Sequence, residues 1–174
     1  MSELSKIIKG RRSVRNFRSD PVPKELIEQI TEVGAWSASG KNMQSARIIA
    51  VTNRELRDRI AEENRKIGGW QEGFDPFYNA PVIIIVIADK SVSTAVYDGS
   101  IAIANMMLKA HELGLGNIWI HRAKQEFEGE LGKEILSKLG IEGEFEGIGH
   151  IALGYTDQTP VAPERKENRV FFIE

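Results

Sequence analysis

The sequence predicts an α+β fold, in which a modest sheet is covered by helices on both faces. Residues 82–88 (Val-Ile-Ile-Ile-Val-Ile-Ala) are continuously apolar and mostly β-branched, which is typical of a strand buried on both sides. Residues 94–113 are apolar on nearly every side, which indicates a buried central helix. With 174 residues, 41% of them hydrophobic, and no internal repeat, the chain is expected to form one domain over residues 1–174.

Before the central strand, local patterns predict three helices and one strand. Pro23 suits a first helical position, Asn53 can cap a helix, and Gly10 and Gly68 are helix stops. Apolar residues recur at helical spacing between these signals. The expected elements, in order, are a helix, a second helix, a strand and a third helix: residues 3–9, 23–34, 47–52 and 54–67.

After the central strand, the chain is expected to form the central helix, a strand, another helix and a last strand. Gly114 and Gly140 end the two helices. The apolar run Val170–Ile173 follows a polar, proline-rich connection and has no hairpin partner, so we expect it to pair with a distant sheet edge, on this chain or another. The expected ranges are residues 94–113, 117–120, 128–139 and 148–153.

Composition excludes several classes of protein. The chain has no cysteine, so disulfides, thiolate metal sites and cysteine nucleophiles are excluded, and its three histidines form no local metal motif. No apolar run approaches the ~20 residues of a membrane span, and the N-terminus lacks the apolar core of a secretory signal. We therefore expect a cytoplasmic protein with no membrane partner and no metal. A net charge of −2 and a pI near 6.0 argue against a nucleic-acid partner.

Positive charge is concentrated near the N-terminus. Five cations without an acid fall within ten residues: Lys9, Arg11, Arg12, Arg15 and Arg18. In an extended chain Arg11, Ser13 and Arg15 point to one side, which offers two guanidinium forks and a hydroxyl to an anion. A solvated basic loop is the alternative interpretation.

Two further polar clusters occur later in the chain. One contains Ser39, Gly40, Asn42 and Gln44, between a helix and a strand, and the other is Arg165-Lys166. Taken alone, the first is an ordinary connection and the second a solvated tail. There is no Walker motif, no G-x-G-x-x-G and no nucleophile–base pattern, so no catalytic side chain is expected. Any redox chemistry would belong to a bound organic cofactor.

Together these clusters resemble the FMN-dependent nitroreductase family, in its short, compact branch. Residues 11–17 resemble its R-R-S-x-R-x-F signature, and residues 38–44 resemble its P-S-x-x-N-x-Q segment. The resemblance continues, in register, through residues 79–88, 98–116, 119–120, 151–155 and 163–166.

This resemblance implies a nitroreductase-like α+β fold with a central mixed or antiparallel sheet. It implies a homodimer whose C-terminal strand reaches the partner, with two FMN sites between the subunits. FMN would be reduced by NADH or NADPH and oxidised by a small electron-poor acceptor, such as a nitroaromatic or a quinone, in a ping-pong reaction.

The resemblance also implies roles for individual residues. Arg11 or Arg12 would bind the FMN phosphate together with Arg165 and Lys166, and Ser13 would add a hydroxyl. Arg15 would lie at the pyrimidine edge of the flavin. The backbone at Ile120 and His121 resembles the donor to flavin N5 or O4. Residues reaching the flavin from the partner subunit would be Ser39, Gly40, Asn42 and Gln44.

Two other functions remain open. Relatives with this core carry out reductive dehalogenation, so a flavin reductase for a specialised substrate is one alternative. A nucleic-acid-binding protein without enzymatic activity is the other, but aromatic residues are not interleaved with the basic ones, as base stacking requires.

The chain departs from the family pattern at Ser45-Ala46, where many relatives have Pro-Trp. That change leaves room for the aromatic loop Gly68–Tyr78. The loop either covers the flavin and stacks on acceptors or belongs to the core.

Overall fold

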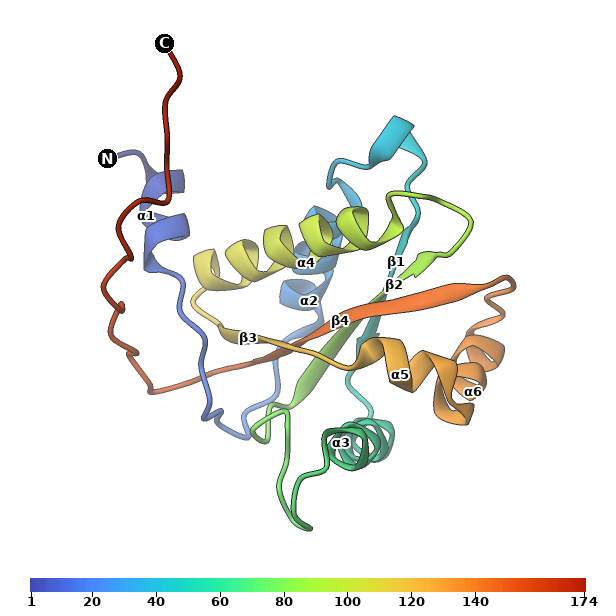
Figure 1. The fold of residues 1–174 in the computed structure, drawn as a ribbon. Coiled ribbons are helices and arrows are strands. Elements are labelled where there is room, and N and C mark those ends of the chain that lie inside the picture. Colours follow the sequence, from blue (N-terminus) through green and yellow to red (C-terminus); the bar gives the residue numbers. More distant parts are fainter.

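A computed structural model describes residues 1–174 and shows one four-stranded sheet with helices on both faces (Figure 1). The order in the sheet is β1-β2-β4-β3, and every neighbouring pair is antiparallel. The expected mixed or antiparallel sheet is therefore antiparallel. The strands are β1 (Ala46–Val51), β2 (Val82–Asp89), β3 (Gly116–Ile120) and β4 (Phe145–Gly154).

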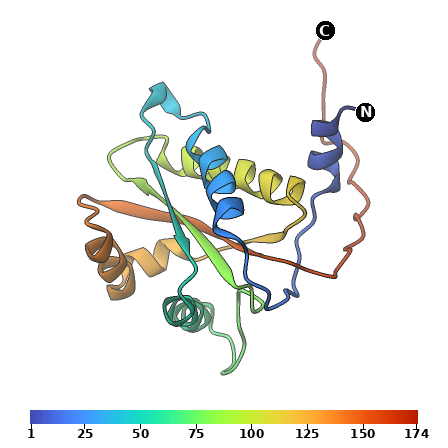
Figure 2. The same ribbon diagram turned by 180° about the vertical axis from the view of Figure 1, so that it is seen from behind.

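The helices form a layer on each face of the sheet (Figures 1 and 2). In the first layer α2 and α4 pack together, and α3, α5 and α6 lie on the opposite face. No helix is both long enough and apolar enough to cross a membrane. The helices are α1 (Glu3–Gly10), α2 (Lys24–Ala35), the short 3₁₀ turn η1 (Gly40–Asn42), α3 (Arg54–Gly68), α4 (Ala95–Glu112), α5 (Ala123–Glu128) and α6 (Glu130–Leu139).

The alternation of side chains along β2 produces the two layers. Ile84 points into the core beneath α2 and α4, whereas Ile83 and Ile85 point into the core formed with α3, α5 and α6. All three are fully buried, and burying one such side chain stabilises the fold by about 1.5–3 kcal/mol. This explains why the strand is apolar at every position.

Most predicted helix ends are confirmed. The side chain of Asn53 accepts a hydrogen bond from the Leu56 amide (2.8 Å), and Gly140 caps α6 in the left-handed conformation (φ 64°). Pro23 is the N-cap of α2 rather than its first residue. The helix expected over residues 128–139 is wrong at its start, because the extended backbone of Gly129 separates α5 from α6.

α5 lies unusually close to β4. A Cβ atom on Gly147 would stand 2.1 Å from the Ala123 carbonyl oxygen, so only glycine permits this approach. The β2–β4 register shifts between Val86 and Ile87, opposite this point. The close approach brings the buried face of α5 against the middle of β4.

The N-terminal basic segment, residues 9–18, lies along the free edge of β3. Ser13 forms a parallel bridge with Asn117, and the Val14 amide donates to the Asn117 carbonyl (3.1 Å). Val14 and Phe17 are buried and anchor the segment. The chain between them and α1 is therefore fixed against the sheet.

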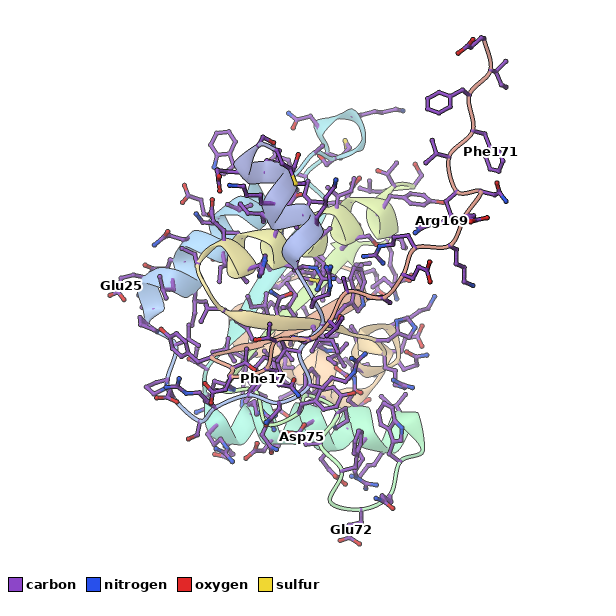
Figure 3. All side chains as sticks on the ribbon, turned by 90° about the vertical axis from the view of Figure 1, so that its left-hand side faces the viewer. Phe17, Glu25, Glu72, Asp75, Arg169 and Phe171 are labelled. Carbon is purple, nitrogen blue, oxygen red and sulfur yellow. The ribbon has the colours of Figure 1, made fainter.

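The C-terminal tail leaves β4 and runs past α1, so both termini lie on the same side of the molecule (Figures 1 and 2). Val170–Ile173 is outside every strand and exposed, and Phe171 stands away from the rest of the chain (Figure 3). Within this one chain, the apolar run does not pair with a sheet edge.

Candidate functional site

Arg11 and Arg12 lie at the end of α1 with part of their charge buried and unpartnered. Arg11 Nη1 and Arg12 Nε are buried and have no hydrogen-bond partner, and neither residue forms an ion pair. Arg12 Nη1 donates to the Arg11 carbonyl (2.7 Å). Burial, followed by the charge of Arg12, lowers the pKa of Arg11. Two adjacent guanidinium groups, each with a buried nitrogen that lacks an acceptor, are suited to binding an anion.

His111, in the last turn of α4, belongs to the same cluster and was not predicted. A Cβ atom on Gly10 would lie 2.9 Å from His111 Nε2, so the glycine allows the close approach. Burial, followed by the charges of Arg11 and Arg12, lowers the pKa of His111. A pocket of about 290 Å³ opens beside Arg12 and His111. No local motif around His111 marks it in the sequence, because helix packing creates the contact.

Ser13 and Arg15 follow on the same segment. Ser13 is half-buried, and its hydroxyl makes no hydrogen bond. Arg15 is exposed, and its backbone amide donates to the side chain of Gln158 (2.9 Å), which ties the segment to the start of the tail. Both side chains are free to bind a ligand.

The polar loop, defined as Ser37–Ser45, lies at the other end of α4. Its centre is held by Asp98, which is 4% exposed and accepts from the Gly40 amide (3.0 Å), the Ser45 hydroxyl (2.7 Å) and Thr94 (3.2 Å). Burial alone would raise the pKa of Asp98, but these hydrogen bonds outweigh it and lower the pKa. Sequence analysis missed Asp98 as a support for this loop.

The polar loop presents several of its side chains outward. Asn42 and Gln44 are exposed, and both have left-handed backbone (φ 55° and 49°), as does Lys41. Ser39 is half-buried, and its hydroxyl accepts from the Gln44 amide (3.0 Å). A pocket of about 510 Å³ lies between this loop, α2 and β1.

The two clusters are far apart within one chain. Gly40 contacts Asp98 near the start of α4, whereas Arg11 and Arg12 cluster with His111 near its end (Figure 1). The helical rise between Asp98 and His111 is about 20 Å. Ser39, Gly40, Asn42 and Gln44 therefore do not meet Arg11, Arg12, Ser13 or Arg15 in a single subunit.

Ile120 and His121 form a third site, at the far end of β3 from the Ser13–Asn117 bridge. Arg122 follows in a left-handed conformation (φ 82°), and its guanidinium lies 4.2 Å from the ring centroid of Trp70. Trp70 contacts Phe74 with a centroid distance of 5.1 Å, so the aromatic loop borders this turn. A planar ligand at the turn would meet both a cation and aromatic rings.

Arg165 and Lys166 are exposed on the tail and make no hydrogen bond or ion pair. The tail residues that line the pocket beside Arg12 are Thr156 and Gln158–Pro160 instead. The structure thus brings Arg11, Arg12 and Ser13 together but leaves Arg165 and Lys166 apart from them.

Comparisons with known proteins show which family and which solved structures this chain resembles. The family model described as "Nitroreductase family" matches residues 8–155. A Methanothermobacter thermautotrophicus protein, with the provisional name NADH dehydrogenase/NAD(P)H nitroreductase, is 36% identical over 121 residues, which are 67% of this chain and 60% of that protein. The chain therefore spans less than two thirds of that relative.

Two further proteins are similar to this chain, one over its whole length and one over a short stretch. A nitroreductase from Desulfitobacterium hafniense, solved with bound FMN, has a TM-score of 0.89 and 27% identity and covers 100% of both chains. Iodotyrosine deiodinase from Nematostella vectensis is 36% identical over 61 residues, which are 35% of this chain and 23% of that protein.

Proposed function

Because the chain belongs to the nitroreductase family, we propose that it is an FMN-dependent oxidoreductase that uses NADH or NADPH to reduce an electron-poor acceptor. One observation in the structure carries this proposal. Arg11 Nη1 and Arg12 Nε are buried without an acceptor, and neither residue forms an ion pair. The phosphate of FMN, with a charge of about −1.5 to −2, would supply the missing acceptors.

The remaining predicted residues would bind other parts of the cofactor. Ser13 would donate its free hydroxyl to the phosphate, and Arg15 would stabilise negative charge at the pyrimidine edge of the ring. When bound, FMN would supply the hydride chemistry, so no side chain is needed as a nucleophile. NAD(P)H and a nitroaromatic or quinone acceptor would occupy the site in turn, as a ping-pong reaction requires.

The positions of the clusters support a shared site in a homodimer. The polar loop and Arg11 lie at opposite ends of α4, so one flavin would contact both only if a second chain supplied one of them. In a two-fold symmetric pair, each chain would contribute the basic segment to one site and Ser39, Gly40, Asn42 and Gln44 to the other.

The outer face of α4 offers a surface for such a dimer. Tyr97, Ile101 and Ala104 are exposed, and Leu108 continues the same stripe at helical spacing. Tyr97 is 70% exposed in the isolated chain, which is unusual for a large aromatic residue on a central helix. A stable dimer of this kind would bury about 2,000 Å² or more.

The C-terminal tail would complete the assembly. Val170–Ile173 is exposed in one chain, as expected of a strand that pairs with the partner. Movement of this tail would also bring Arg165 and Lys166 to a phosphate, which their exposed positions allow.

Anaerobic titration of the FMN-loaded protein tests this function. We expect stoichiometric FMN binding, bleaching of the flavin absorbance by NADH or NADPH, and its return on adding a nitroaromatic or a quinone. A purified chain that does not bind FMN, or whose flavin neither nucleotide reduces, would contradict the proposal.

A second candidate function is reductive dehalogenation, favoured by the short stretch similar to iodotyrosine deiodinase. A halogenated phenol belongs in the acceptor panel for this reason. Halide release that is faster than reduction of any nitroaromatic or quinone would favour this second function.

A further inference from the structure

Three buried polar side chains lie beneath the turn that joins β3 to α5. Asn64 comes from α3, Glu126 from α5 and His150 from β4, and none is more than 2% exposed. A carboxyl group and an imidazole in such a place are unfavourable unless each polar atom has a partner. The partners of these side chains therefore indicate what the cluster does.

Glu126 stands at the centre of the cluster. Its Oε2 lies 2.7 Å from His150 Nε2, and its Oε1 accepts from Asn64 Nδ2 (2.5 Å). The rings of His150 and Phe77 form a T-shaped pair, with their centroids 5.2 Å apart. Each side chain is thus held in one orientation by its neighbours.

Both outer ends of the cluster reach the backbone of the turn. His150 Nδ1 lies 3.3 Å from the Ile120 carbonyl oxygen, and because a carbonyl can only accept, Nδ1 must carry the hydrogen. Asn64 Nδ2 uses its second hydrogen to donate to the His121 carbonyl (2.9 Å). Two consecutive carbonyl groups are therefore held toward the protein interior.

Holding the carbonyls also sets the direction of the next amides. No peptide bond in the chain is cis, and in a planar trans peptide the N–H points opposite to the C=O. The amides of His121 and Arg122 therefore point away from the buried cluster. Neither amide donates a hydrogen bond within the chain. Consecutive unpartnered amides beside a left-handed residue such as Arg122 are suited to an electronegative acceptor.

We propose that Asn64, Glu126 and His150 are positioning residues, which together aim the amides of His121 and Arg122 at an acceptor atom of the bound flavin ring. The inference rests on the proposed function, because the flavin is the acceptor. Donors that are fixed before binding stabilise the negative charge of the reduced ring without reorganisation. Since the contact uses backbone amides, it does not depend on the chemistry of the side chain at position 121.

Asn64→Asp tests this directly, because it preserves shape but replaces the donor to His121 with an acceptor. We expect about tenfold weaker FMN binding. The midpoint potential should fall by about 30 mV for each tenfold by which affinity for reduced FMN drops relative to oxidised FMN. FMN should shift the ¹⁵N amide resonance of Arg122 in the wild type, and it should shift this resonance less in the variant.

Two other variants keep the test decisive. Asn64→Ala also removes the donor but leaves space for water, so it serves if Asn64→Asp does not fold. Glu126→Gln can still accept from Asn64 and can donate to His150 Nε2, so this variant should keep FMN affinity and potential near their wild-type values.

Ile60→Val is the matched control, one helical turn earlier on α3 and fully buried, but with a side chain that forms no hydrogen bond to the turn. It should lower the melting temperature and leave FMN affinity and potential unchanged. If folded Asn64 variants bind FMN with wild-type affinity and potential, this inference is wrong and the proposed function stands. If the wild-type chain does not bind FMN, the proposed function fails and the inference fails with it.

Discussion

Ser45 donates its hydroxyl to Asp98 over 2.7 Å, although 53 positions separate them in the chain. The same carboxylate accepts the amide of Gly40, so it fixes both the middle and the last residue of the polar loop to the first turn of α4. Ser45 departs from the Pro-Trp pair of many relatives, and the structure shows that it has a structural role of its own.

Asp98→Asn should lower the free energy of unfolding by about 1–3 kcal/mol at neutral pH, because hydrogen-bond partners of the carboxylate lose an acceptor. The folded-state pKa of Asp98 is lowered, so its stabilisation is present above the unfolded pKa and is lost as the pH falls through the folded pKa. Urea unfolding should show that the wild type and Asp98→Asn differ in free energy of unfolding by a constant amount between about pH 5 and pH 8. This difference should shrink below about pH 4. A difference that stays the same at about pH 2 would contradict this role.

Arg11→Gln should weaken FMN binding by about tenfold to a hundredfold, because a charge-assisted bond to the phosphate is lost. Riboflavin, which lacks the phosphate, provides the control ligand, and its affinity should not change. The variant without flavin should be no less stable than the wild type, since burial of the unpaired guanidinium opposes folding. Fluorescence titration measures both affinities. Equal losses of affinity for FMN and riboflavin would show that Arg11 does not bind the phosphate.

Ile101→Lys should convert the protein to monomers and abolish FMN binding, because it puts a charge in the exposed stripe of α4. Leu139→Lys is the control, since Leu139 is also exposed but lies at the end of α6, on the opposite layer. Light scattering measures the oligomeric state of each variant, and flavin absorbance measures its FMN occupancy. Only Ile101→Lys should change both. A monomeric Ile101→Lys protein with full FMN occupancy would rule out the shared site.

The aromatic loop contains one residue of the core, Phe77, and one residue at the edge of the β3–α5 turn, Trp70. Phe77 is fully buried, so Phe77→Ala should lower the free energy of unfolding by about 3–5 kcal/mol. Trp70 is half-buried beside Arg122, so Trp70→Ala should raise KM for aromatic acceptors by about 2- to 12-fold with little thermal destabilisation. If Trp70→Ala only melts earlier while acceptor kinetics stay the same, the loop is entirely core.

Much of the fold could be predicted, because single residues carry clear local signals. The unbroken apolar run of β2 indicated burial on both faces, and Asn53 and Gly140 mark helix ends by their own chemistry. α5 was missed, since it begins after a left-handed Arg122 and has no side-chain cap. Its position depends on the space at Gly147, which is a property of tertiary packing.

The proximity of Arg11, Arg12 and Ser13 could be predicted, because they belong to one segment, whereas their role in binding stays a prediction. Contacts made across the fold left no local pattern: His111 meets Gly10 through the packing of α1 on α4, and Asp98 meets Ser45 through the packing of α4 beside β1. The positions of Arg165 and Lys166 depend on the path of the tail. In a single chain that path is not set by contacts with a second subunit.

In the proposed dimer, the separation of Arg11 from the polar loop by the length of α4 has a genetic consequence. A chain defective at Arg11 and a chain defective at Asn42 would each form dimers with two damaged sites. In a mixed dimer, however, both defects would fall in one site, and the other site would be wholly wild type. Random mixing should therefore restore about one quarter of the sites, so two inactive alleles would complement each other when expressed together.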